Sequence, residues 1–135
     1  MRFEDLSVGQ TAEFSKTVTE ADVMAFANVT GDFNPVHTDA EAAAKSRFGG
    51  RIAHGMLSAG YISAAIAGHL PGPGSIYLGQ TLKFTAPVRF GDTVTTTVEV
   101  LELLSKNRAR LATTCRNQNG ETVVEGEAIV MVVNE

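Results

Sequence analysis

The stretch GDFNPVH, residues 31–37, places an acid, an amide and an imidazole close together around Pro35. A histidine has an unperturbed pKa of about 6.5, so His37 could take up a proton at neutral pH and return it. Asp32 could hold or activate the same water molecule. Gly, Asp, Asn and Pro are also common turn formers, so the stretch taken alone indicates either a simple turn or a catalytic loop.

The whole chain has the composition of one soluble domain, which we expect to span residues 1–135. It has 135 residues, of which 44% are hydrophobic and 19% charged, and its net charge of −4 gives no support to nucleic-acid binding. Its first ten residues include two acids and lack the apolar core of a signal peptide, and no apolar run reaches the length of a membrane span. Cys115 is the only cysteine, which excludes an internal disulfide and favours a reducing, cytoplasmic location.

Helical signals follow a first strand, which the alternating pattern predicts over residues 11–18. Thr19 and Asp22 have the spacing of a capping box and predict a helix over residues 20–29, ended by Gly31.

Two more helices are predicted before the chain turns to strands. Thr38 and Glu41 repeat the capping-box spacing, so they predict a short second helix and place His37 just before it. A third helix is expected from His54 to Leu70. Its apolar residues are spread around the axis, which is typical of a buried helix.

The second half of the chain changes to a period of two, with β-branched residues separated by turn signals. Ala109, Leu111, Thr113 and Cys115 should share one face of a strand. We therefore predict an α+β domain in which a curved antiparallel sheet of about five strands, a meander or a close variant, wraps around the central helix. Such a sheet covers one side of the helix and leaves long edges, so we expect a homodimer with paired sheets. The strand segments are IYLGQTLKF, TVTTTVEVLEL, ARLATTCRN and TVVEGEAIVMVV.

The chain resembles the MaoC-like dehydratases and, more narrowly, the (R)-specific enoyl-CoA hydratases, which have the hot-dog fold. The pair His54-Gly55 and the segment FTAPVRFGD resemble two further signatures of that family. The stretch LPGPGSIYLGQTLKF is similar to short bacterial members that feed polyhydroxyalkanoate synthesis. The family's main motif is matched by Phe26, Val29, Thr30, Gly31, Asp32, Asn34, Pro35, Val36, His37 and Ala43.

This resemblance implies a lyase that adds water reversibly and syn to a trans-2-enoyl-CoA of short or medium chain, giving the (R)-3-hydroxyacyl-CoA. Asp32 and His37 would contact one catalytic water, with Asp32 favoured as the group that activates it. The backbone N–H of Gly55 would stabilise the thioester oxygen, and the expected helix start supports this role. Asn34 would orient the loop, and Ser63 matches a serine near the acyl pocket.

The remaining chemistry-bearing residues receive weaker assignments. Lys45, Arg47 and Arg51 form a basic cluster that is either a solvated surface or a contact for the phosphates of coenzyme A. His54 is expected to be a structural residue, hydrogen-bonded to the backbone at the helix start. The three histidines lack the spacing of metal ligands, so no metal is expected. No cofactor is expected either, since coenzyme A is part of the substrate.

Two alternative functions stay open. The same chemistry could run as the dehydration of 3-hydroxyacyl groups on an acyl-carrier protein, although the best-known enzymes of that kind use a histidine with a glutamate from the other subunit. The chain could also be a non-catalytic protein that binds acyl thioesters. The complete pair of Asp32 and His37 on one loop argues against both. A thioesterase shares the expected fold, but no other feature of the sequence favours it.

Overall fold

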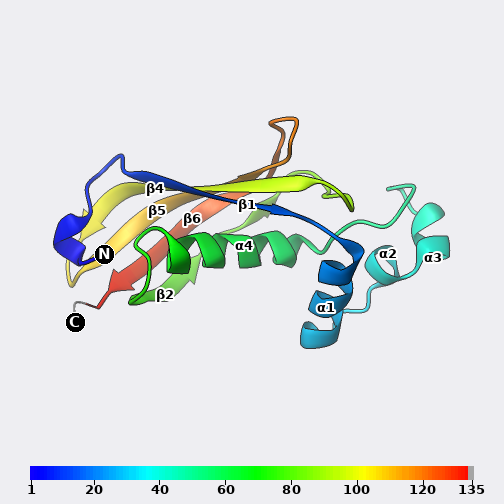
Figure 1. The fold of residues 1–135 in the computed structure, drawn as a ribbon, viewed down its shortest axis with the longest axis horizontal. Coiled ribbons are helices and arrows are strands. Elements are labelled where there is room, and N and C mark those ends of the chain that lie inside the picture. Colours follow the sequence, from blue (N-terminus) through cyan, green and yellow to red (C-terminus); the bar gives the residue numbers. More distant parts are fainter. Residues whose placement is uncertain (134–135) are drawn as a thin grey trace.

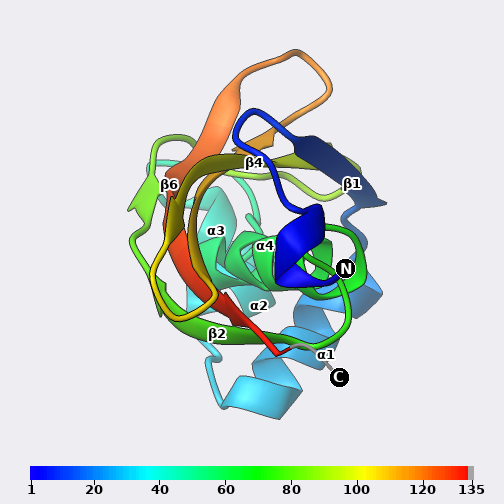
Figure 2. The ribbon, with the colours of Figure 1, turned by 90° about the vertical axis from the view of Figure 1, so that its left-hand side faces the viewer.

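The computed structural model describes residues 1–133, in which a curved sheet wraps around one long helix. All neighbouring strands are antiparallel, in the order β1-β4-β5-β6-β2, and the short β3 pairs with β6. Seen end-on in Figure 2, the helix α4 lies inside the curve of the sheet. The predicted α+β arrangement is therefore confirmed. The strands are β1 (Thr11–Thr17), β2 (Ser75–Gln80), β3 (Lys83–Phe84), β4 (Thr93–Leu104), β5 (Arg108–Arg116) and β6 (Thr122–Val132).

The sheet has six strands where about five were predicted. The stretch expected to form one strand over residues 76–84 breaks after Gln80 into β2 and β3, and both pair with β6. Of the four strands predicted to form a meander or a close variant of one, β4, β5 and β6 follow each other in a meander, whereas the first, now β2 and β3, pairs with β6. Because β1 adds to the β4 side and β2 to the β6 side, β1 and β2 are the two edges of the main sheet.

Helix α4 (Gly55–Gly68) supplies one side of the core. Its buried residues include Tyr61, Ile62 and Ile66, which belong to one apolar cluster with the inward face of the sheet. That face includes Ala109, Leu111, Thr113 and Cys115 of β5, all fully buried, as the alternation predicted. The opposite side of α4, with Gly60, Ser63, Ala64 and Ala67, is exposed because the sheet does not close around it.

Three short helices lie beyond the first turn of α4 (Figure 1): α1 (Glu20–Thr30), α2 (Pro35–Thr38) and α3 (Ala40–Ala44). The capping box of α1 is confirmed. The Asp22 N–H donates to the Thr19 hydroxyl, and the Thr19 N–H donates to the Asp22 carboxylate, each at a distance of 3.1 Å. Gly31 ends α1 in the left-handed region, at φ 83°. A single 3-10 turn (Phe3–Asp5) precedes β1.

The predicted start of the second helix is wrong. Asp39, not Thr38, caps α3, since its carboxylate accepts from the N–H groups of Glu41 and Ala42 at 3.0 and 3.1 Å. An additional turn, α2, begins after Asn34, whose side-chain oxygen accepts from the Val36 N–H at 3.4 Å. An Asn cap followed by Pro in the first position starts a helix early. His37 therefore lies inside α2 rather than just before a helix.

Within residues 1–133 no helix has both the length and the apolar character needed to cross a membrane.

Candidate active site

A cavity of about 430 Å³ opens beside the first turn of α4. Its walls come from α2, the segment 47–53, the start of α4, the segment 84–88 and β6. Most of the lining is apolar, and the ionisable side chains among the lining residues are those of His37 and Arg47. The cavity therefore combines an apolar chamber with one imidazole and one cation.

The His37 ring is held in one tautomer. Its Nδ1 lies 2.8 Å from the carbonyl oxygen of Ile52, and a carbonyl can only accept, so Nδ1 carries the proton. Nε2 is therefore the unprotonated nitrogen of the neutral ring. Burial lowers the pKa of His37 below its ordinary value, helped by the nearby His54 and opposed by the Ile52 hydrogen bond and the charge of Asp32. The ring is thus neutral, and able to accept a proton, at neutral pH.

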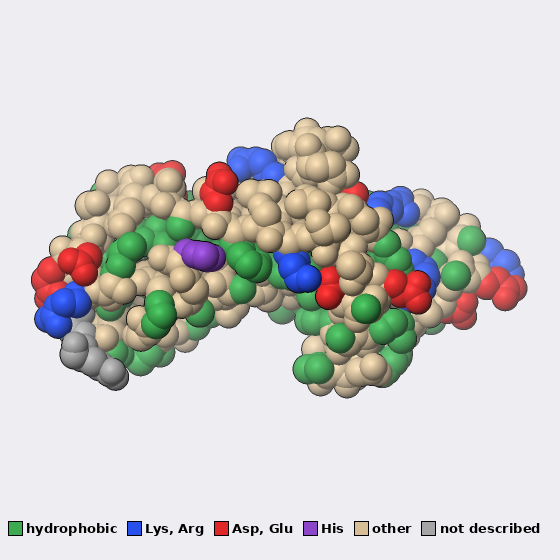
Figure 3. Space-filling model, viewed as in Figure 1, with side chains coloured by type: hydrophobic (Ala, Val, Ile, Leu, Met, Phe, Trp, Pro, Cys, Tyr) green, Lys and Arg blue, Asp and Glu red, His purple; other side chains and the backbone are tan. Residues whose placement is uncertain are grey.

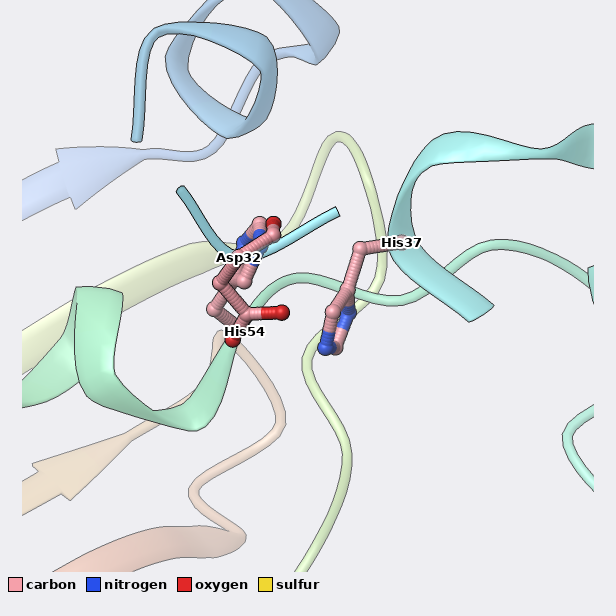
Figure 4. A group of neighbouring side chains, drawn as sticks. All are labelled: Asp32, His37 and His54. Carbon is pink, nitrogen blue, oxygen red and sulfur yellow. The ribbon is translucent and has the colours of Figure 1, made fainter. Parts of the chain in front are cut away.

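Asp32 lies in the irregular segment between α1 and α2. The N–H of Asn34 donates to Oδ1 of Asp32 at 3.2 Å, and the N–H of Asp32 donates to the Thr30 hydroxyl at 3.2 Å. The carboxylate is exposed, and in Figure 4 it lies beside the His37 ring, across the same space. The sequence prediction that these two groups face one site is consistent with this arrangement.

His54 is bonded to the backbone, as predicted. Its Nε2 lies 2.9 Å from the carbonyl oxygen of Asp32, so this nitrogen carries the proton. Its ring stacks on that of His37 with centroids 4.0 Å apart. One ligand atom from each of Asp32, His37 and His54 lies within 4.8 Å of the others, so within residues 1–133 these three groups form a set that could hold a metal ion.

Gly55 is the first residue of α4 and lines the cavity. Its N–H belongs to the first turn and has no acceptor within the helix, so it is available to an anionic oxygen at the positive end of the helix dipole. A Cβ at this position would lie 2.6 Å from Cδ1 of Phe84. Glycine is therefore the residue that lets the cavity reach the main chain here.

The two polar residues expected near the site have other positions. Asn34 caps α2 and donates its N–H to Asp32, so it shapes the loop locally. Ser63 is exposed on the open side of α4 and is not among the residues that line the cavity. Sequence reasoning missed Ser58, which is buried and does line the cavity. Its spacing of three residues from Gly55, one helical turn, was the available signal.

The basic cluster divides into one inward and two outward side chains. Arg51 is turned inward: its Nε donates to the His37 carbonyl at 2.8 Å and its guanidinium lies 4.8 Å from the Phe90 ring centroid. Arg47 is exposed at the wall of the cavity. Lys45 is exposed and pairs with Glu41 at 3.5 Å.

A helix wrapped by an antiparallel sheet, with a pair of ionisable side chains beside its first turn, defines a hot-dog domain whose site opens at the helix start. The sequence matches the family model of the MaoC like domain over residues 5–124. The chain belongs to this family.

Its relatives include proteins that it matches over most of their length. It is 52% identical over 131 residues to a 3-hydroxybutyryl-CoA dehydratase of Methylorubrum extorquens, covering 96% of this chain and 83% of that protein. It is 51% identical over 131 residues to an (R)-specific enoyl-CoA hydratase of Rhodospirillum rubrum, covering 96% and 90%. The solved structure of an unliganded R-hydratase from Pseudomonas aeruginosa superposes with a TM-score of 0.95 at 56% identity, covering 99% of this chain and 86% of that one.

Proposed function

We propose that this protein is an (R)-specific enoyl-CoA hydratase, a lyase that adds water reversibly and syn to trans-2-enoyl-CoA to give (R)-3-hydroxyacyl-CoA. The observation that carries the proposal is that the Asp32 carboxylate and a nitrogen of the His37 ring lie within 4.8 Å of each other, next to a cavity that His37 and Gly55 line. The names of the relatives, a 3-hydroxybutyryl-CoA dehydratase and an (R)-specific enoyl-CoA hydratase, describe the two directions of this reaction.

The Gly55 N–H is the proposed donor to the thioester oxygen. Addition of hydroxide to the β-carbon pushes electrons onto that oxygen, and a donor at the positive end of a helix dipole stabilises the resulting enolate. One such donor contributes roughly 10²–10³-fold in comparable sites. The mostly apolar walls of the cavity would strengthen this interaction and accept the acyl chain.

Asp32 and His37 handle the protons of one water molecule. The oxygen of this water forms a bond to the β-carbon, and the proton that it loses is shared between the Asp32 carboxylate and Nε2 of His37. The same proton then returns to the α-carbon. Because His37 is neutral, the pair holds no spare proton, so the water supplies both new groups. Delivery from one face of the substrate gives syn addition and a single product configuration.

We propose that the reaction uses neither a metal nor a separate cofactor. The proposed mechanism uses Nε2 of His37, which a metal would need as a ligand, to move the proton. Coenzyme A is part of the substrate. Its phosphates would contact Arg47 at the wall of the cavity, and Lys45 lies two residues earlier in the chain. Arg51 is less suited to bind phosphate because its guanidinium already makes inward contacts. Activity should survive treatment with a chelator.

We further propose that two copies form a homodimer in the cytoplasm. The edge strand β2 exposes Ile76, Tyr77 and Leu78, and the uncovered side of α4 lies between the edges β1 and β2. Hydrophobic side chains gather in the hollow along α4 in Figure 3. Pairing of two β2 edges would cover both features. The buried free thiol of Cys115, whose pKa is raised by burial, suits a reducing compartment.

The test is hydration of crotonyl-CoA, followed through the loss of enoyl absorbance, with chiral analysis of the product. We expect the (R)-alcohol, and a loss of about 10²–10⁴-fold in the folded variants Asp32→Asn and His37→Gln. Wild-type turnover in either variant contradicts the site. A folded protein that converts only carrier-protein thioesters supports the acyl-carrier-protein dehydratase instead. One that binds every thioester and converts none is a binding protein.

A further inference from the structure

Two side chains of the segment Arg51–His54 hold the main-chain carbonyls of the proposed catalytic pair. Arg51 Nε donates to the carbonyl of His37 at 2.8 Å, and His54 Nε2 donates to the carbonyl of Asp32 at 2.9 Å. Between them, the Ile52 N–H donates to the Val36 carbonyl at 3.1 Å, and the Ile52 carbonyl accepts from the His37 ring. The segment therefore fixes the catalytic loop to the start of α4.

Within residues 31–34, the part of the loop that holds Asp32, the bond from His54 has no equivalent. Every other hydrogen bond that residues 31–34 make within the described chain has its partner at most five residues away in sequence. The bond from His54 to Asp32 spans 22 residues. Local bonds fix the shape of residues 31–34, but the His54 bond is the one that fixes their position relative to α4.

The surroundings of His54 hold its ring in one orientation. The ring is 2% exposed and lies between the rings of Phe26, at 4.7 Å, and His37, at 4.0 Å between centroids. Nε2 carries the proton that the Asp32 carbonyl accepts. Nδ1 is buried and has no hydrogen-bond partner among the described residues.

We propose that His54 is a positioning residue for hydration, acting through the backbone of Asp32. Its ring donates one hydrogen bond that sets the distance of the Asp32 carboxylate from His37, and the His37 ring stacks against its face. The two imidazoles hold opposite tautomers, with the proton on Nε2 of His54 and on Nδ1 of His37. This proposal rests on the proposed function, because that function assigns the catalytic pair.

Two substitutions separate the hydrogen bond from the ring. In His54→Gln the amide nitrogen can reach the place of Nε2, so the donor is kept and the stacking lost. In His54→Phe the stacking is kept and the donor lost. A displacement of about 1 Å at a reacting group can cost about 10²-fold in rate. We expect kcat of His54→Phe to fall about 10²-fold, and that of His54→Gln less than tenfold, with KM within about threefold in both.

The measurement is steady-state hydration of crotonyl-CoA at temperatures well below the unfolding midpoint of each variant. His69→Gln is the matched control, because the remaining histidine is exposed at the far end of α4, and it should retain wild-type kcat. Equal losses in the Gln and Phe variants overturn the proposal. So does a loss that follows only the folded fraction of each variant, since that is the behaviour of a structural residue.

An NMR measurement keeps this proposal separate from the proposed function. Isotope-labelled histidine nitrogens report directly which ring nitrogen carries the proton, whether or not the protein turns over. We expect a proton on Nε2 of His54 and on Nδ1 of His37 at neutral pH. A proton on Nδ1 of His54 removes the hydrogen bond to Asp32 and overturns the positioning role, even in an active enzyme. The protein can also show these tautomers and convert no enoyl thioester. In that case the proposed function is wrong, and so is a positioning role of His54 in hydration. The hydrogen bond from His54 to Asp32 is then the part that is confirmed.

Discussion

Replacement of Gly55 by alanine tests whether the substrate oxygen must approach the main chain at the start of α4. The new Cβ would lie 2.6 Å from Cδ1 and 2.7 Å from Cε1 of Phe84. Carbon atoms in contact lie about 3.5–4.0 Å apart, so the ring has to move by about 1 Å. It can move, because Phe84 is half exposed and no backbone atom blocks the new methyl group.

The variant should therefore fold normally and lose activity. Alanine is the better helix former, and the ring that moves is at the surface, so the free energy of unfolding should change by less than about 1 kcal/mol. The methyl group and the displaced ring crowd the place of the thioester oxygen. Alanine keeps the N–H, but a substrate oxygen that is held away from it loses the contribution of one oxyanion donor, roughly 10²–10³-fold, and we expect a fall of that size in kcat/KM for crotonyl-CoA.

Two further variants identify the cause. Gly50→Ala is the matched control, since its Cβ would lie 3.7 Å from Nη1 of Arg89, an ordinary contact, and activity should stay within about twofold of wild type. Combining Gly55→Ala with Phe84→Ala removes the clash and leaves only the methyl group, so part of the activity should return. Retention of more than about a tenth of wild-type activity by folded Gly55→Ala would refute the assignment of this N–H.

Three other perturbations test separate parts of the structure. Arg47→Ala should raise KM for crotonyl-CoA by about fivefold, which corresponds to the loss of one exposed charge contact, and Lys45→Ala should raise it by less. Crotonyl-pantetheine lacks the nucleotide phosphates, so an equal rise in its KM in Arg47→Ala argues against phosphate binding. Burial lowers the pKa of His37, so its neutral form persists below pH 6.5 and the acid limb of kcat/KM should have its midpoint below that value. A midpoint at or above 6.5 contradicts the lowered pKa of this base. Gly126→Ala would place a Cβ on the carbonyl oxygen of Thr81 and should lower the free energy of unfolding by about 1–3 kcal/mol in urea, whereas an unchanged midpoint would show that this strand can move away.

The sequence predicts the parts of the site that depend on local spacing. Asp32 and His37 come from one short loop, and the start of α4 was correct within one residue, so Gly55 was placed at a helix N-terminus from its pattern alone. Neighbouring residues of similar chemistry limit such reasoning. Thr38 and Asp39 are both residues that can cap a helix. Asp39 caps α3 because Thr38 already belongs to the separate turn α2, which Asn34 and Pro35 begin.

Other features depend on contacts that no local pattern encodes. The predicted strand over residues 76–84 breaks where the Thr81 N–H bonds to the Glu127 carbonyl at 2.9 Å, next to Gly126. Arg51 is the cation of the basic cluster that turns inward, because its guanidinium contacts both the Phe90 ring and the His37 carbonyl. Both outcomes follow from partners more than ten residues away, so alternation and charge spacing could not predict them.

The stacked pair of histidines shows why residues of one type have different roles within a few ångströms. Each ring has one nitrogen bonded to a main-chain carbonyl, that of Ile52 for His37 and that of Asp32 for His54. The bond of His37 uses Nδ1, so its lone pair is on the nitrogen that is free to take a proton from water. The bond of His54 uses Nε2, so its lone pair is on the buried nitrogen that has no partner in the described chain. The fold assigns the roles through the carbonyl that each ring meets, because the intrinsic pKa of the two side chains is the same.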